Sequence, residues 1–225
     1  MGNFEAKHPR AKDGKFKEKH RAESGLELTC TPQDWESTDT ELVKPAALKN
    51  LGAAGDKIVK QMVKDSPSAD NGLYGPMDWT KKTGAANILE DYLDKVGFDG
   101  DCKRFSTLDS EGAEKLLGVL PSMAYQDRQN EAPTLGKMLA ACAANPEKVH
   151  LSGYMVDSSR WDERISVDAI HIADPSAVKN TILSGQDAKD KWQQYQEKLG
   201  LGDSEAPDEI YSTGGEDPGW TLWWD

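Results

Sequence analysis

The chain has 225 residues and a net charge of −12, with 37% hydrophobic and 29% charged residues. This balance is typical of a globular protein with a modest core, arranged as one ordinary domain or two small ones. The longest apolar runs, 116–120 and 138–144, are far shorter than the roughly 20 residues that cross a bilayer, and the basic N-terminus lacks the apolar segment of a secretory signal. We therefore expect a cytoplasmic protein without a membrane partner.

Several common chemistries lack their residues in this sequence. Cys30, Cys102 and Cys142 are widely spaced and form no C-x-x-C pair, which predicts neither a disulfide framework nor a zinc site. The G-x-S-x-G and H-E-x-x-H motifs are absent, and LGAAGDK at 51–57 has the lysine but not the spacing of a phosphate-binding loop. We expect no cofactor and no metal, and we favour a non-enzymatic role.

Charge is unevenly distributed along the chain. Residues 1–22 contain seven Lys or Arg and three Asp or Glu, so the remainder carries −16. Such an acidic body repels nucleic acid and favours a basic protein as partner, without sequence-specific nucleic-acid binding. A host-defence inhibitor that imitates nucleic acid would fit the same charge. The sequence leaves the oligomeric state open.

Residues 1–28 are rich in lysine and have no apolar periodicity, which predicts a flexible basic arm. Within it, HPRAKDGKF at 8–16, followed by Glu18 and Lys19, resembles a short opener of uncharacterised proteins from actinobacterial phages and mobile elements. The resemblance favours a phage or mobile-element origin; the motif is not a catalytic signature and assigns no function to the rest of the chain.

The portion 29–147 is predicted to be mainly helical. Apolar residues recur at helical spacing over 45–65 and again over 80–96, where Gly97 would end the helix. Asp109 is placed to cap a helix that reaches Leu120, and a further helix is predicted over 133–144. Glycines at 52 and 55 weaken the first helix, so a break is expected there.

The portion 148–225 has a different character. KVHLSGYMVD and RISVDAIHIAD are alternating and β-branched, which predicts an antiparallel hairpin centred between Arg160 and Trp161. Helices are predicted over 175–183 and 188–199, followed by an acidic loop. Together these patterns indicate an α+β fold, a helical N-terminal portion packed with a small antiparallel sheet built on the C-terminal hairpin. One domain or two remains open.

The chain ends in GWTLWWD, which contains three of its seven tryptophans. Burial of these rings nearly offsets the entropy of ordering the segment, so docking also needs main-chain hydrogen bonds, most simply as a strand beside the hairpin. In such a strand Trp220 and Trp224 share the core face, and Trp223 lies opposite. The alternative is a free acidic-aromatic tail that folds only on a partner.

The hairpin contains the candidate catalytic residues. Its centre places His150 directly across from His171 on one face. Asp168 differs from His171 by an odd number and should therefore point to the other face, among aliphatic residues that would raise the pKa of its carboxyl group. The alternative interpretation is that these are ordinary strand histidines and a hydrogen-bonded aspartate.

Arg160, Trp161 and Trp223 are the candidate partner-binding residues. Tryptophan and arginine dominate interaction hot spots, and a hairpin tip exposes them. The alternative places Trp161 against a neighbouring helix. The leading hypothesis is an acidic interaction protein that binds a basic partner. The alternatives are a small hydrolase-type enzyme that uses His150 or His171 with Asp168, and a virion or assembly component.

Overall fold

The computed structural model describes residues 42–46, 51–66, 71–95, 100–202, 204–213 and 218–225. The described residues all belong to one compact unit, Ser37–Asp225. Residues 1–41 and 47–50 lie outside the described part of the chain. They include the predicted basic arm and part of the first turns of the helix predicted over 45–65.

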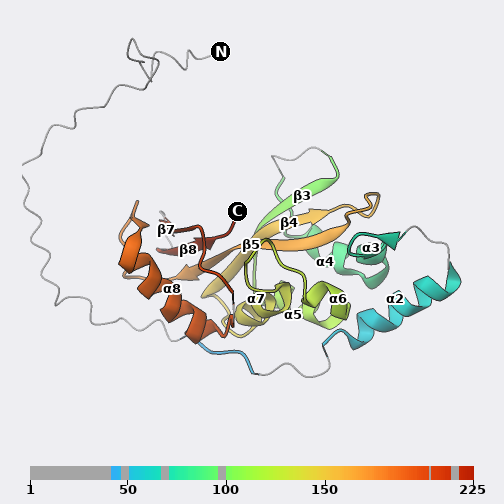
Figure 1. Cartoon of the computed structure of the whole chain (residues 1–225), viewed down its shortest axis with the longest axis horizontal. Helices are drawn as coiled ribbons and strands as arrows, with labels where there is room; N and C mark the ends of the chain where they lie inside the picture. Colours follow the sequence, from blue (N-terminus) through green and yellow to red (C-terminus); the bar gives the residue numbers. More distant parts are fainter. Residues whose placement is uncertain (1–41, 47–50, 67–70, 96–99, 203, 214–217) are drawn as a thin grey trace, which may run out of the picture. The chain divides into compact units, whose positions relative to one another are not determined.

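A six-stranded antiparallel sheet is the main element of the fold (Figure 1), with strand order β3-β4-β5-β8-β7-β6. Its strands are β3 Cys102–Leu108, β4 Val149–Val156, β5 Arg164–Ala173, β6 Ile182–Leu183, β7 Glu209–Thr213 and β8 Gly219–Trp223. A separate pair of very short strands, β1 Asn71–Gly72 and β2 Gly75–Pro76, forms a second small sheet. The α+β class expected from the sequence is confirmed.

The terminal tryptophans lie in the sheet, as predicted. Strand β8 pairs with β5 on one side and with β7 on the other. Trp220 and Trp224 are each 2% exposed and belong to the core, whereas Trp223 is only partly buried. The docked-strand interpretation and its assignment of faces are therefore confirmed.

Helices pack on one face of the sheet. In Figure 1, α5 (Ser110–Val119), α7 (Leu135–Ala143) and α8 (Gly185–Leu199) lie on the same side of it. Asp109 caps α5 as predicted, accepting a hydrogen bond from the Gly112 N–H at 2.9 Å. The ring of Trp192 in α8 meets Trp224 edge to face, with centroids 5.6 Å apart. One contiguous apolar core thus joins both halves of the chain.

The prediction of one continuous helix over 80–96 is wrong. The chain forms α3 (Trp79–Thr83) and α4 (Ala85–Glu90), separated by Gly84 in the left-handed conformation at φ 85°. Beyond α4, Leu93 forms a β-bridge with Phe105. Glycine adopts positive φ without a steric penalty, so the apolar stripe continues across the break and conceals it in the sequence.

The first helix, α2, begins later than its apolar pattern indicates. It spans Ala53–Asp65 and starts after Gly52, whose φ is 85°. A β-carbon at Gly52 would lie 2.3 Å from the Ser122 hydroxyl oxygen, so this close approach to α6 (Ser122–Tyr125) requires glycine. The structure shows a helix start after Gly52, and the break expected at these glycines stays untested because residues 47–50 lie outside the described part of the chain.

Two other expectations for the C-terminal portion are corrected. The segment 175–183 is not a helix: the chain turns after Asp174, whose side chain accepts hydrogen bonds from the N–H and hydroxyl of Ser176, and then enters β6. The predicted acidic loop contains β7. Local hydrogen bonds of an Asx turn compete with helix formation at this point.

Candidate functional site

The two histidines of the hairpin face each other across β4 and β5, as the register predicted. His171 is held between two hydroxyl groups, with Nε2 2.7 Å from the Ser152 oxygen and Nδ1 2.8 Å from the Thr221 oxygen. The Ser152 hydroxyl donates its only proton to the Ser106 carbonyl at 2.8 Å. Ser152 must therefore accept a hydrogen bond from His171, which places the ring proton on Nε2 and makes Nδ1 the acceptor for Thr221.

This chain of hydrogen bonds limits the chemistry available to His171. Both ring nitrogens are occupied, and the Ser152 proton points to a backbone carbonyl rather than to the histidine. The arrangement therefore differs from a serine nucleophile activated by a histidine base. Burial, followed by electrostatic interactions with His150 and Arg104, lowers the pKa of His171 from 6.5 to about 4. The imidazole is consequently neutral at physiological pH.

Acidification is expected to destabilise the protein through His171. The unfolded chain binds a proton near pH 6.5, whereas folded His171 binds it only near pH 4. Stability from this group is complete above pH 6.5 and is lost as the pH falls toward 4, by about 3 kcal/mol in total. Chemical denaturation of the wild type and of His171→Asn, repeated between neutral and acidic pH, measures this. Parallel pH profiles in the two proteins would contradict the assignment.

Asp168 does not lie where its parity predicted. Ser152 pairs with Ala169 but Gly153 pairs with Val167, so a β-bulge leaves Asp168 unpaired in β5. Its side chain meets Arg104 in a two-pronged ion pair of 2.7 and 3.1 Å, instead of lying among aliphatic residues. The extra residue of a bulge reverses the alternation beyond it, which is why the prediction failed. The carboxylate is neutralised by Arg104.

A shallow pocket of about 610 Å³ contains both histidines. Asp109 and Ser106 also line it, so a second polar group is within the same hollow. Within the described ranges, no group of three or more His, Cys, Asp or Glu side chains is placed to hold a metal ion. The predicted catalytic candidates are thus brought near one another, but His171 and Asp168 are both engaged in structural contacts.

Trp223 lies over a smaller hollow on the same face as His171. Arg104, Ser152, Glu209 and Tyr211 are among the residues that line it, and its volume is about 330 Å³. The indole of Trp223 is partly buried there. This candidate partner-binding residue is therefore far less prominent than Trp161.

The tip of the β4–β5 hairpin presents Trp161 to the solvent. Its side chain is 62% exposed, and the Arg160 beside it forms a two-pronged contact with Asp162 at 2.8 and 2.7 Å. The Trp161 carbonyl accepts a hydrogen bond of 2.6 Å from the N–H of Leu73, which is itself 56% exposed. We call Leu73, Tyr74, Arg160 and Trp161 the hairpin-tip surface.

Glu163 fastens this tip to α3. It is 2% exposed and accepts hydrogen bonds from the Asp78 N–H at 2.5 Å, the Thr80 N–H at 2.8 Å and the Thr80 hydroxyl at 2.5 Å. The indole nitrogen of Trp79 also lies 3.4 Å from the Glu163 carbonyl. Three short contacts to one buried carboxylate hold the hairpin tip and the start of α3 in a fixed relation.

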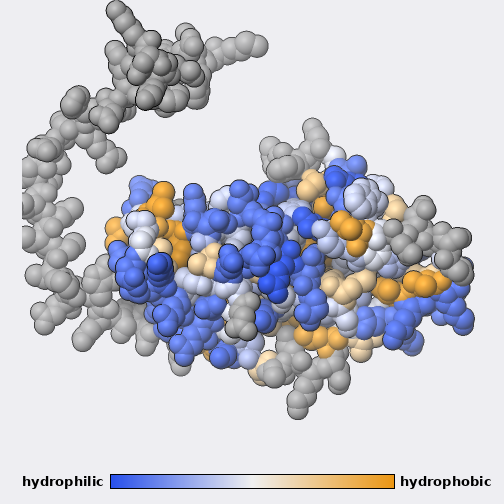
Figure 2. All heavy atoms as spheres, viewed as in Figure 1, coloured by the Kyte–Doolittle hydropathy of each residue, from blue (hydrophilic) through white to orange (hydrophobic). Residues whose placement is uncertain are grey.

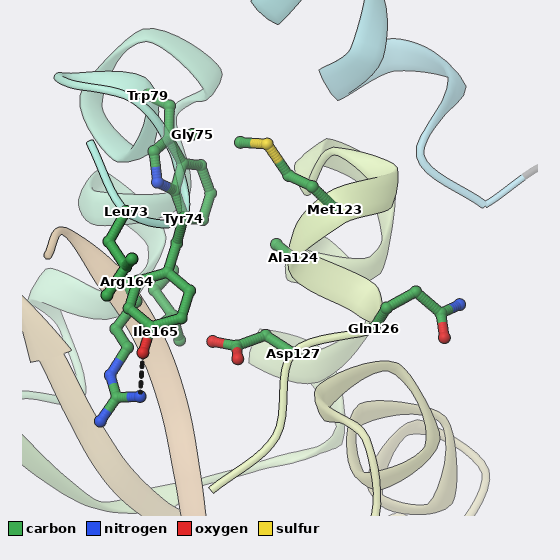
Figure 3. A pocket seen from close by; sticks show the side chains of 10 residues that line it. All are labelled: Leu73, Tyr74, Gly75, Trp79, Met123, Ala124, Gln126, Asp127, Arg164 and Ile165. Carbon is green, nitrogen blue, oxygen red and sulfur yellow. Dashed lines mark hydrogen bonds between the residues drawn. The ribbon is translucent and has the colours of Figure 1, made fainter. Parts of the chain in front are cut away.

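A pocket of about 430 Å³ adjoins the hairpin-tip surface. Figure 3 shows Met123, Ala124 and Asp127 on one side of it, facing Leu73, Tyr74, Trp79 and Arg164 on the other. We call it the Tyr74 pocket. Its lining residues come from the β1–β2 region, the start of α3, α6 and the start of β5.

At the polar end of the Tyr74 pocket, Arg164 stacks between two tyrosine rings. Its guanidinium carbon is 5.2 Å from the ring centroids of both Tyr74 and Tyr154. The same guanidinium donates to the Tyr74 hydroxyl at 3.1 Å, to Gln129 Oε1 at 3.4 Å and to the Tyr154 hydroxyl. Arg164 thereby fixes the orientation of Tyr74 at the pocket wall.

Sequence reasoning identified Trp161 and Arg160 but missed the residues around them. Leu73, Asp127, Glu163 and Arg164 lie in three segments that are distant along the chain. The one local signal was the Gly- and Pro-rich stretch 66–79, which predicted a loop but not its contact with the hairpin tip.

No described helix is long and apolar enough to cross a membrane. Comparison with known proteins yields no match to a family model, to a curated protein or to a solved structure.

Proposed function

We propose that the chain is a non-enzymatic interaction protein that binds a basic protein partner through the hairpin-tip surface. The observation that carries this proposal is the exposure of Trp161, 62%, on a tip that buried Glu163 holds rigidly. A large apolar side chain in solvent adds no stability to the monomer, whereas a rigid aromatic anchor loses little entropy on binding.

The surroundings of Trp161 support the same function. Leu73 is exposed next to it and leads into the Tyr74 pocket. Figure 2 shows hydrophobic surface on α2 and next to the β4–β5 tip. An apolar patch bordered by charged groups is the usual composition of a protein interface.

The charge of the chain supports a basic partner. The sequence from residue 23 onward carries −16, which attracts a positively charged surface and accelerates encounter with it. The resemblance at residues 8–16 further favours a phage or mobile-element origin, in which such a partner would be a host protein.

Replacing Trp161 with alanine is expected to abolish capture of the partner without unfolding the protein. Immobilised wild type and Trp161→Ala would be incubated with lysate of the host cells, and retained proteins identified by mass spectrometry. Because the side chain is exposed, stability should change by about 0.5 kcal/mol or less.

The matched control is Ile182→Ala. Ile182 is 69% exposed, on the edge strand β6 at the other side of the sheet. The Ile182→Ala protein should capture the same partner proteins as the wild type. Equal capture by wild type and Trp161→Ala would contradict the proposal. Concentration-dependent self-association lost with Trp161 would favour an assembly component instead.

One observation favours a hydrolase-type enzyme as a second candidate. The pocket of about 610 Å³ contains both His150 and His171 beside Asp109. Against it, His171 is hydrogen-bonded on both sides and Asp168 is paired with Arg104. The contacts at this pocket stabilise the sheet, so the geometry supports the interaction function better.

A further inference from the structure

We propose that the Tyr74 pocket receives a lysine or arginine side chain of the partner, with Asp127 as its counter-ion. This inference rests on the proposed function and adds the residue class that the pocket selects. Four observations support it. The Asp127 carboxylate has no ion-pair partner among the described residues, and the Arg164 guanidinium already contacts neighbouring side chains. The pocket walls are apolar, and the pocket adjoins the hairpin-tip surface.

Asp127 has an acceptor that no described residue uses. One carboxylate oxygen accepts a hydrogen bond from the Arg128 N–H at 2.9 Å, and the side chain takes part in no ion pair within the described segments. Figure 3 shows this carboxylate pointing into the pocket. Burial raises the pKa of Asp127 above its usual value despite the positive charge of Arg164. A cationic head group would compensate this partly desolvated charge.

Arg164 is the only other charged residue of the pocket lining, and it is already engaged. Its guanidinium contacts two tyrosine rings and donates to three acceptors, including the Tyr74 hydroxyl. Three of its five N–H donors are used, and an anionic ligand at the other two would face the Asp127 carboxylate in the same pocket. A cationic ligand leaves the Arg164 contacts intact and uses only the free capacity of Asp127. The geometry therefore favours a cation over an anion.

The walls of the pocket suit the aliphatic stem of a long basic side chain. Leu73, Trp79, Met123 and Ile165 supply apolar surface along the pocket. Lysine and arginine bury their methylene groups along such surface while the charged head reaches a polar partner. Methionine adapts its shape to either side chain.

The position of the pocket relates it to Trp161. Leu73 lines the pocket and donates its N–H to the Trp161 carbonyl at 2.6 Å. Leu73 therefore belongs both to the pocket lining and to the hairpin-tip surface, so a partner that covers Trp161 lies next to the pocket. The hydrophobic anchor and the charged pocket would together select a basic residue next to an apolar surface of the partner.

The test uses single side chains as probes. The N-acetyl methylamides of arginine and lysine would be titrated into ¹⁵N-labelled full-length protein, with the N-acetyl methylamide of norleucine as the uncharged probe. We expect amide shifts at Gly75, Ala124 and Asp127 with millimolar affinity for the two cations, and affinity weaker by about tenfold for norleucine. Asp127→Asn, which keeps the acceptor for the Arg128 N–H, should weaken cation binding by about tenfold.

Glu114→Gln is the matched control, because it removes one exposed negative charge from α5. It should bind the cations like the wild type. Absence of shifts around the pocket, equal binding of norleucine, or unchanged binding by Asp127→Asn would overturn the inference. Loss of partner capture in Trp161→Ala would then still support the proposed function. Conversely, specific cation binding with capture independent of Trp161 would uphold the pocket and reject that function.

Discussion

Replacing Trp220 with alanine is expected to lower the free energy of unfolding by about 3–5 kcal/mol, whereas Trp223→Ala should lower it by about 1 kcal/mol. Trp220 is 2% exposed, in a strand that pairs on both sides, and its ring packs on the core face opposite Ile172. Trp223 is only partly buried, on the other face. Urea denaturation of the two variants measures the difference.

Trp220→Phe is the informative control. The Trp220 indole nitrogen is buried and has no hydrogen-bond partner among the described residues. Phenylalanine keeps an apolar ring and removes this unpaired donor, so the loss should be smaller than with alanine. Similar losses from alanine at positions 220 and 223 would contradict the assignment of these residues to opposite faces.

The docked position of the C-terminal strand changes how the tail can be studied. Strand β8 lies between β5 and β7, and Trp224 contacts α8 through Trp192. Deleting the last six residues would remove a central strand and expose both neighbours. Such a truncation therefore reports on folding, and the question of binding is better put to single exposed residues such as Trp161.

The elements with strict periodicity could be predicted from the sequence. Alternation in β4 and β5 predicted the hairpin register correctly for Val149–Ser152, including the pairing of His150 with His171, because one face had to be buried. From Gly153 to the tip, the β-bulge shifts the pairing by one residue. The placement of Trp220 and Trp223 on opposite faces of β8 followed from the same two-residue period. Asp109 before an apolar pattern marked the start of α5 through its side-chain cap.

The errors arose where one residue interrupts a pattern. Gly84 breaks a helix whose apolar stripe continues on both sides of it, and Asp168 forms a bulge that reverses the alternation of β5. Gly84 is a weak local sign of a break, since glycine destabilises a helix interior, but the apolar stripe that continues past it outweighed that sign. Asp168 carries no local sign of the bulge, because the partner that holds its side chain, Arg104, is distant in the sequence.

The candidate site was predictable only in its exposed part. A hairpin tip with Trp and Arg indicates a binding surface from local sequence alone. The Tyr74 pocket needs Asp127 and Arg164 to meet across a long sequence separation, which depends on how α6 and the β1–β2 region pack. Packing of this kind has no periodic signature in one sequence.

Glu163→Ala is expected to lower the free energy of unfolding by about 3–5 kcal/mol, because several buried hydrogen-bond donors lose their acceptor at once. The carboxylate is 2% exposed and accepts hydrogen bonds from two backbone N–H groups and one hydroxyl. Alanine leaves these three donors buried without an acceptor. Urea denaturation measures the total effect, and hydrogen exchange of the α3 amides measures its location.

Glu163→Gln separates the loss of charge from the loss of shape. Its amide oxygen can accept from only part of the cluster, and its NH₂ group faces donors, so an intermediate loss of about 1.5–3 kcal/mol is expected. If Glu163 positions the hairpin tip, the folded glutamine variant should also capture less partner, although Trp161 is unchanged. Faster hydrogen exchange in α3 together with full partner capture would show that Glu163 serves stability alone. Unchanged hydrogen-exchange protection of α3 in both Glu163 variants would contradict the anchoring role, because the Thr80 hydroxyl has no other partner among the described hydrogen bonds.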